Sequence, residues 1–368
     1  MNEALKELIP QLEQARKPES AVPWTLDTPH AQSIFGFDSD TQSWKAAPSY
    51  QPSPTSPPND STTSTVIAKL ALFSWNIDFM LPRAHARMTA GLSELHRQIA
   101  ALPETTAAVV FLQECVPGDL ETIGATPWVR GDFLRTDVDS SDWASRMYGT
   151  TTLVDKRLGV EGVFRVHYEL TRMERDALFV DVVFPAGDSS RDGGSGGNGG
   201  DGEVGKKGGK DGKKKIIRFC NTHLESLAVD PPYRPPQVAL AAKFMHEESV
   251  HGALLAGDLN AIQPFDRTLH SDNNLRDAYL ELGGQEDSEE GYTWGQQAPP
   301  QLRAMYGCSR MDKVFYCGGV AVERFARFGA DVEVDGEKER EAILKWGGFE
   351  NAWITDHLGV FAEVAVVD

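Results

Sequence analysis

Apolar runs of strand length alternate with amphipathic helical patterns through most of the chain. Residues 83–101 carry apolar side chains at spacings of four, three and four, which is typical of one face of a helix. Two further helices are predicted at 236–249 and 275–282. The predicted strands are rich in β-branched, aromatic or alternating apolar residues and lie at 66–76, 107–114, 148–154, 160–170, 177–184, 216–226, 253–256, 310–317 and 358–367. Because some strands are hairpin neighbours and others are separated by helices, the pattern favours an α+β fold with two mixed sheets packed face to face and helices outside.

The N-terminal region has a different pattern. Residues 2–16 place leucines at helical spacing, although Pro10 weakens a helix there. A short helix docked on the core is the preferred interpretation, and a helix that binds a partner is the alternative. Aromatic side chains follow in otherwise polar sequence, so 1–45 is expected to form an arm that packs on the domain. Pro, Ser and Thr fill fourteen of the twenty positions in 46–65, which is typical of a linker.

The remaining residues, 66–368, are expected to form one domain with a single interruption. Twelve of the 29 residues in 187–215 are glycine, and six lysines lie between 206 and 215. This composition predicts a flexible insert between two strands of a hairpin, because the strand pattern resumes directly afterwards. The lysines could touch a phosphate backbone, but a solvated linker is the preferred interpretation.

Composition and charge narrow the range of functions. The chain has 368 residues, of which 40% are hydrophobic, enough for one large core or two smaller ones. With 54 acidic and 36 basic residues, the net charge is −18. This argues against a general polyanion binder, because nonspecific nucleic-acid binding depends on Lys and Arg, although a local basic groove could still bind nucleic acid. Four cysteines without CxxC spacing indicate reduced thiols of an intracellular protein, and no apolar run is long enough for a membrane span.

Polar side chains follow the apolar strands at the points where the strands end. In the stretch HGALLAGDLN, a buried strand ends in Gly257, and Asp258 and Asn260 follow directly. A cap, a turn or a satisfied core polar group would explain each such residue separately. Because strands of one sandwich converge at its ends, however, we expect the whole set to share a pocket. The set consists of Asn76, Asp78, Glu114, His223, Glu225, Asp258, Asn260, Asp312, Asp356 and His357.

These residue types permit a narrow range of chemistry. The set offers carboxylates, amides and histidine, without a Gly-rich phosphate loop or a Ser/His/Asp order. Mg²⁺ suits such a site because it takes oxygen ligands, uses only one or two carboxylates and keeps waters and substrate phosphate. Mn²⁺ is the alternative ion. The ion would polarise a phosphoryl oxygen and stabilise charge during an in-line displacement.

Four short motifs resemble the endonuclease/exonuclease/phosphatase superfamily. They are SWN at 74–76, LQE at 112–114, GDLN at 257–260 and TDH at 355–357. Ser74 and Thr355 differ from the family residues but keep a hydroxyl group. Further segments are similar to the tyrosyl-DNA phosphodiesterase 2 group within this superfamily, namely WNID at 75–78, THLES at 222–226, RPPQ at 234–237, YTW at 292–294 and RMD at 310–312. The resemblance covers roughly residues 70–366 without the insert, and residues 1–65 have no family counterpart.

The resemblance implies the four-layer α/β/β/α sandwich of DNase I-like proteins. It also implies a Mg²⁺-dependent phosphodiesterase that hydrolyses 5′-phosphotyrosyl-DNA adducts in DNA repair and leaves a 5′-phosphate. The partner would be DNA with a 5′ protein or peptide adduct, the location the nucleus or the cytoplasm, and the protein a monomer. The alternatives are another hydrolase of the superfamily (an abasic-site endonuclease, an RNA deadenylase, or a phosphoinositide or sphingomyelin hydrolase) and a non-catalytic scaffold. The intact motif residues disfavour the scaffold.

The resemblance further implies a role for each candidate residue. Glu114 would be the chief metal ligand, with Asp78 and Asp356 near the ion directly or through water. Asp258 would activate or orient the attacking water.

Amides and histidines would complete the site. Asn76 and Asn260 would hold the phosphate and the water through amide hydrogen bonds. His357 would stabilise the pentavalent phosphate or assist the leaving group, and His223 would also face the phosphate. Asp312 would orient His357 through a ring N–H, a usual task of a carboxylate behind a histidine. Because an unpaired carboxylate is costly to bury in an apolar strand, a hydrogen bond between these two side chains is expected.

Two further residues, Trp294 and Arg234, would line the substrate groove. For Trp294, stacking on a base and packing as an ordinary core aromatic are equally favoured. The histidines outside these motifs are interpreted as structural, and they are His30, His85, His96, His167, His246, His251 and His270.

Overall fold

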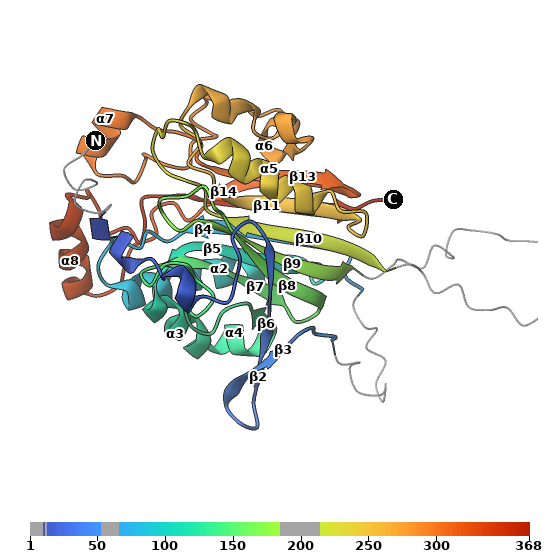
Figure 1. Ribbon diagram of the computed structural model, residues 1–368. Helices are drawn as coiled ribbons and strands as arrows, with labels where there is room; N and C mark the ends of the chain where they lie inside the picture. Colours follow the sequence, from blue (N-terminus) through green and yellow to red (C-terminus); the bar gives the residue numbers. More distant parts are fainter. Residues whose placement is uncertain (1–9, 12, 53–65, 185–213) are drawn as a thin grey trace, which may run out of the picture.

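The computed structural model describes residues 10–11, 13–52, 66–184 and 214–368, which form two β-sheets packed face to face with helices outside (Figure 1). The seven-stranded sheet contains, in spatial order, β1 (Pro29–Gln32), β8 (Gly159–His167), β9 (Asp176–Phe184), β10 (Lys215–Thr222), β11 (Gly252–Asp258), β13 (Asp312–Gly318) and β12 (Arg276–Asp277). The eight-stranded sheet contains β14 (Val320–Phe328), β15 (Gly359–Val366), β4 (Lys69–Asn76), β5 (Thr106–Cys115), β7 (Gly149–Asp155), β6 (Phe133–Arg135), β2 (Ile34–Asp38) and β3 (Ser43–Ala47). Both sheets mix parallel and antiparallel pairs, so the predicted α+β sandwich is confirmed.

The helices predicted at 83–101, 236–249 and 275–282 are present with shifted ends, whereas the other helices of the described residues were not predicted. In the described residues the helices are α2 (Ala84–Ala100), α3 (Pro117–Ala125), α4 (Pro127–Asp132), α5 (Arg234–Met245), α6 (Ala278–Glu281), α7 (Pro300–Tyr306) and α8 (Glu337–Gly347), with the 3-10 helices η1 (Glu19–Ala21), η2 (Pro264–Thr268) and η3 (Ser271–Asn273). The helix predicted at 275–282 is shorter because residues 276–277 pair with β13 as β12. The helix predicted at 2–16 lies largely outside the described residues. Across the described ranges, the helices are too short or too polar to cross a membrane.

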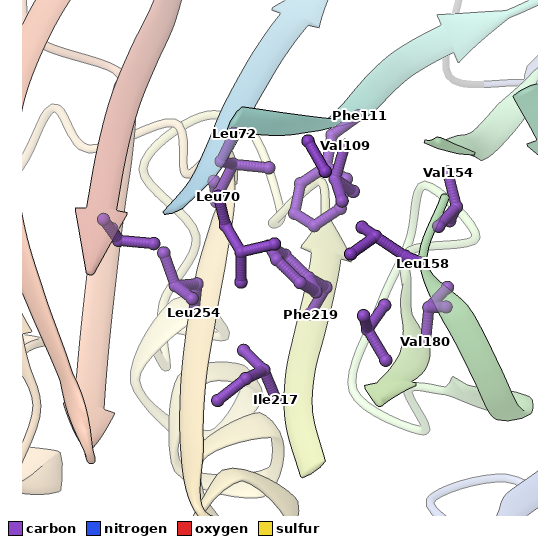
Figure 2. Close-up of a cluster of buried hydrophobic side chains, with 14 of the residues drawn as sticks. Leu70, Leu72, Val109, Phe111, Val154, Leu158, Val180, Ile217, Phe219 and Leu254 are labelled. Carbon is purple, nitrogen blue, oxygen red and sulfur yellow. The ribbon is translucent and has the colours of Figure 1, made fainter. Parts of the chain in front are cut away.

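The main hydrophobic core lies between the two sheets (Figure 2). Alternate residues of each strand point to opposite faces. Leu70 and Leu72 of β4 therefore pack into this core, together with Phe219 of β10. Their neighbours Ala71 and Phe73 pack on the outer face in a second core with residues of α2, α3 and α8. Because each sheet is covered on both faces, its central strands are apolar at nearly every position, as their sequences are.

The N-terminal arm contributes strands to both sheets, which is more than the packing expected for 1–45. β1 pairs antiparallel with β8, whereas β2 and β3 extend the eight-stranded sheet beyond β6. The indole N–H of Trp44 donates to the carbonyl of Gly124 (3.2 Å), and the guanidinium of Arg135 lies 4.2 Å from its ring centroid. Trp24 stacks on His167 with 4.0 Å between ring centroids. The arm is thus part of the folded unit.

The two low-complexity predictions fall mostly on residues outside the described ranges, since 53–65 and 185–213 are not described. The strands on either side of the Gly-rich insert do pair as a hairpin. Phe184 of β9 lies opposite Lys215 of β10 in an antiparallel ladder.

The strands that carry the candidate site residues end together. β4 and β5 run parallel, with Asn76 and Glu114 at their carboxyl ends. β10 and β11 run parallel in the other sheet, where β11 ends with Asp258 and His223 directly follows β10. β13 is antiparallel to β11 and begins with Asp312, which lies opposite Asp258.

Candidate active site

A cleft of about 790 Å³ opens where these strands end. Its lining includes nine of the eleven candidate residues, namely Asn76, Asp78, Glu114, His223, Asp258, Asn260, Trp294, Asp356 and His357. Of the remaining two, Asp312 lies behind His357 and is fully buried. Most polar residues at the strand ends therefore share one cavity. Glu225, which was expected in the same pocket, does not line it: its buried carboxylate accepts hydrogen bonds from the hydroxyl of Thr171 and the backbone N–H of Arg172.

His357 is held between two carboxylates. Its Nδ1 donates a hydrogen bond to Asp312 (2.8 Å), as expected, and its Nε2 lies 3.6 Å from a carboxylate oxygen of Asp258. Burial alone would lower the pKa of His357, but the charges of Asp312 and Asp258 raise it well above the ordinary value. Burial in turn raises the pKa of Asp312 to about 6, despite the opposing effect of His357. These two carboxylates favour the imidazolium form, in which Nδ1–H points to Asp312 and Nε2–H to the side of Asp258.

Asp258 is fixed by two hydrogen bonds and by a neighbouring histidine. It accepts hydrogen bonds from the amide of Asn76 (3.0 Å) and the backbone N–H of Asn260 (2.9 Å), and Nε2 of His223 lies 3.3 Å away. Burial would raise its pKa, but the neighbouring histidines outweigh this effect and lower it. The preceding Gly257 allows the close approach to β10, since a Cβ there would lie 1.7 Å from the carbonyl oxygen of Thr222. Asp258 is therefore an ionised, fixed acceptor.

His223 has the opposite electrostatic environment. Its Nδ1 lies 2.6 Å from Nη1 of Arg175. Because a guanidinium can only donate, this ring nitrogen must accept, and the proton of the neutral ring resides on Nε2. Burial and then the charge of Arg175 lower the pKa of His223. Arg175 was not predicted as a site residue. Its only signal in the sequence is its place in RMERDALF (172–179), where a charged residue comes just before an apolar strand.

A second group of carboxylates, the acidic trio, lines the cleft: Asp78, Glu114 and Asp356. Glu114 accepts a hydrogen bond from the backbone N–H of Phe79 (3.0 Å), and Asp356 accepts one from the indole N–H of Trp294 (2.7 Å). Burial, followed by repulsion from Asp356 and Glu114, raises the pKa of Asp78 to about 8. Burial and repulsion by Glu114 also raise the pKa of Asp356. Three oxygen-donor groups that repel one another in this way fit a divalent cation such as Mg²⁺.

Another set of potential ligands is more compact. Donor atoms of Asp258, Asp312 and His357 lie within 4.8 Å of one another. The hydrogen bond from His357 to Asp312 accounts for this compactness and already occupies Nδ1. Since Mg²⁺ prefers oxygen ligands over imidazole, the acidic trio is the better match for this ion.

Three polar residues of the cleft have a strained backbone. Asp78, Glu114 and Asn260 have φ values of 56°, 58° and 47°, which non-glycine residues rarely adopt. Strained backbone of this kind persists only where the surroundings enforce it, and it is common at functional sites. In these three residues it sets the direction of a polar side chain that lines the cavity.

Trp294 is not an ordinary core aromatic, and its stacking on a base stays a prediction. It is half-buried and lines the cleft, with its ring centroid 6.5 Å from that of Tyr306. Its N–H is used to hold Asp356. The indole is therefore tied to the acidic trio and also presents a surface to the cavity.

Arg234 corrects a sequence prediction, because it does not line the groove. Its side chain is buried and forms a paired salt bridge with Asp266 at 2.8 and 2.7 Å. It also donates to the backbone carbonyls of Glu225 and Leu227. A buried guanidinium requires such partners. Arg234 therefore fixes the loop after β10 against η2, and RPPQ supplies a structural residue.

Comparison with known proteins places this geometry in context. The model of the Endonuclease/Exonuclease/phosphatase family matches residues 73–357. Similar solved structures include D. rerio TDP2 complexed with single-strand DNA product, with 18% identity over 81% of this chain and 99% of that chain and a TM-score of 0.54. TDP2 from C. elegans has 18% identity over 81% and 75% of the two chains, with a TM-score of 0.55. Bacteroides thetaiotaomicron mannosyl-6-phosphatase has 15% identity over 80% and 99%, with a TM-score of 0.51. No curated protein matches the chain. At these identities the similarity shows only a shared fold. This fold is the α/β/β/α sandwich that the sequence motifs imply.

Proposed function

The chain belongs to the endonuclease/exonuclease/phosphatase family, and on this premise we propose that it is a Mg²⁺-dependent phosphodiesterase that hydrolyses 5′-phosphotyrosyl adducts of DNA. The family assignment makes it a phosphoester hydrolase. The observation that best supports the finer proposal is the pairing of His357, whose imidazolium form is favoured, with an ionised Asp258 beside the acidic trio in one cleft. The fold similarity to TDP2, one structure of which contains a DNA product, agrees with a DNA substrate. Such a substrate implies action inside the cell, and in the nucleus where there is one.

The acidic trio would hold the ion. When bound, Mg²⁺ supplies charge that polarises a phosphoryl oxygen and offsets the negative charge of the transition state. The ring of Trp294 keeps Asp356 in position for this role through its N–H.

Asp258 would orient the attacking water. Its ionised carboxylate is held by Asn76 and by the backbone of Asn260. Because these hydrogen bonds fix the orientation of the carboxylate, a water that donates to it is held in a defined position. The water oxygen forms a bond to phosphorus, and the bond from phosphorus to the tyrosyl oxygen breaks. The water proton passes by way of Asp258 to solvent, while the released phenolate takes a proton from solvent. The products are tyrosine and a 5′-phosphate.

His357 would act on the charge that develops at the phosphate. Because Asp312 fixes Nδ1–H, the Nε2–H faces the cleft and donates to a phosphate or leaving-group oxygen. A donor aimed in advance at such a charge contributes roughly 2.7 to 4 kcal/mol. His223 is neutral and presents a second, uncharged N–H beside Asp258.

The purified chain can be tested on a panel of oligonucleotides that carry a 5′-phosphotyrosyl group, an abasic site or a polyA tail, together with lipid phosphoesters. Each substrate is incubated with Mg²⁺ and with EDTA. We expect the 5′-tyrosyl substrate to yield a 5′-phosphate end with Mg²⁺ only. Cleavage of another substrate while the tyrosyl adduct stays intact would refute the substrate assignment. The assignment as a phosphoester hydrolase would still hold.

A further inference from the structure

The cleft has an exposed apolar wall, formed by Met80, Ile262 and Tyr306. These side chains are 44%, 40% and 52% exposed, and all three line the cavity. They come from three separate places: the segment after β4, the segment after β11 and the end of α7. Exposed apolar side chains that gather around one cavity mark a surface for an apolar group of a ligand. The volume of about 790 Å³ falls within the range of single small-molecule sites, roughly 300 to 1,000 Å³.

The cations of the cleft are already engaged. Three arginines are among its lining residues in the described part of the chain, and lysine is not. Arg310 is fully buried and bound to Asp277 and Glu286. Arg175 is buried against His223. Arg267, at the exposed rim, pairs with Asp287 at 2.8 Å.

Carboxylates outnumber these arginines. Seven line the cavity, namely Asp78, Glu114, Asp258, Asp266, Glu286, Asp287 and Asp356. Two of them are paired with buried cations behind the lining, Asp266 with Arg234 and Glu286 with Lys313, and the other five still outnumber the arginines. A divalent cation at the acidic trio would offset part of the carboxylate charge, and it could contact only one phosphate of the ligand. A chain of phosphates needs Lys or Arg along its path, because neutralising each phosphate is what gives polyanion binding its strength. The rim around Arg267 and Asp287 provides no net positive charge for a second phosphate.

We propose that the cleft recognises one phosphodiester and the aromatic group attached to it, and does not bind the phosphates further along a nucleic acid. This rests on the proposed function, since it names which part of the DNA adduct is recognised. The apolar wall takes the aromatic leaving group. A mononucleotide ester is therefore as good a substrate as a long one.

Two probes test this directly. One is the p-nitrophenyl ester of thymidine 5′-monophosphate, and the other is a decathymidylate with the same ester on its 5′-phosphate. Both release p-nitrophenolate, so kcat/KM can be compared in Mg²⁺ from 50 to 200 mM salt. We expect values within about fivefold of each other at every salt concentration. A protein that neutralised six phosphates of a single strand would lose roughly 300-fold in affinity over this range.

A variant at the rim makes the comparison sharper. Asp287→Lys changes a largely exposed side chain and frees Arg267, so the fold is not at risk. It should raise kcat/KM for the decamer several-fold at low salt and steepen its salt dependence, with little change for the mononucleotide.

The full chain and a variant lacking residues 190–212 are measured together, because the insert contains lysines. A decamer preference above about tenfold that persists in the deletion variant overturns the inference about the cleft. A preference that disappears in the deletion variant supports it and assigns the extra binding to the insert. If neither probe is hydrolysed in Mg²⁺, the proposed function itself fails, and this inference with it.

Discussion

Replacing Asp312 by Asn tests whether this residue acts through His357. The variant keeps the shape and a hydrogen-bond acceptor but removes the charge that stabilises the imidazolium across a 2.8 Å hydrogen bond. A hydrogen bond to a charged group contributes about 1.5 to 3 kcal/mol. If all of it is lost from the transition state, the rate falls by roughly 10- to 150-fold, at about 1.4 kcal/mol per tenfold. We therefore expect kcat for the p-nitrophenyl probe to drop within this range while Tm changes by only a few degrees.

Asp137→Asn provides the matched control. Asp137 is an equally buried carboxylate, paired at 2.9 Å with Arg165, and it does not line the cleft. Its replacement leaves a buried guanidinium with one charge partner fewer, so it should lower Tm and preserve kcat well below that temperature.

The combination with His357→Ala completes the test. Residues that act as a unit are not additive. The double variant should therefore lose little more activity than the worse single variant. If the two losses multiply, or if Asp312→Asn retains full activity, Asp312 has only a structural role.

Four further predictions concern the metal site, the insert and the N-terminal arm. Glu114→Gln should lower kcat at least about a hundredfold, because it removes a charge from the acidic trio; near-normal rate and Mg²⁺ dependence would exclude Glu114 as a ligand. Deleting residues 190–212 should change Tm by no more than about 3 °C, since loop length contributes slowly to closure entropy; a large loss of Tm would contradict this. His167 is buried, and burial lowers its pKa to about 2, so the unfolded chain binds a proton below pH 6.5 that the folded chain does not. Between pH 6.5 and 5.0, the free energy of unfolding, measured with denaturant, should therefore fall by about 2 kcal/mol more in the unmodified protein than in His167→Phe. Equal pH dependence of the two proteins would show that His167 is protonated in the fold. Trp24→Ala should lower Tm by a few degrees because it uncovers the His167 ring, and an unchanged Tm would show that the arm contributes no stability there.

The sequence was most informative where one physical rule applied to many residues at once. Strands covered on both faces must be apolar throughout, so the central strands were visible as continuous runs. A polar residue at the end of such a run stands out, and Asn76, Glu114 and Asp258 were identified in this way. The pairing of Asp312 with His357 followed from the cost of burying a lone carboxylate.

Other features depend on contacts that local sequence does not encode. β1 and β2 are short and join the sheets through partners more than 90 residues away, such as Phe35 opposite Arg135, and β3 is attached only through β2. Arg234 and Arg175 both lie beside a site motif or strand in the sequence. Only the tertiary structure shows that their roles differ. Arg234 finds Asp266 and becomes structural, whereas Arg175 reaches His223.

The two histidines of the cleft illustrate why a list of residue types does not determine chemistry. His223 and His357 both lie against Asp258, at 3.3 and 3.6 Å. The group behind each ring is different: Asp312 accepts from Nδ1 of His357, whereas Arg175 donates to Nδ1 of His223. The first arrangement favours the imidazolium and the second favours the neutral ring, since one neighbour is an anion and the other a cation. The cleft therefore presents a charged donor and an uncharged donor on either side of one carboxylate. Under the proposed function, this difference would allow His357 to stabilise phosphate charge while His223 positions Asp258 without adding a second cation to the site.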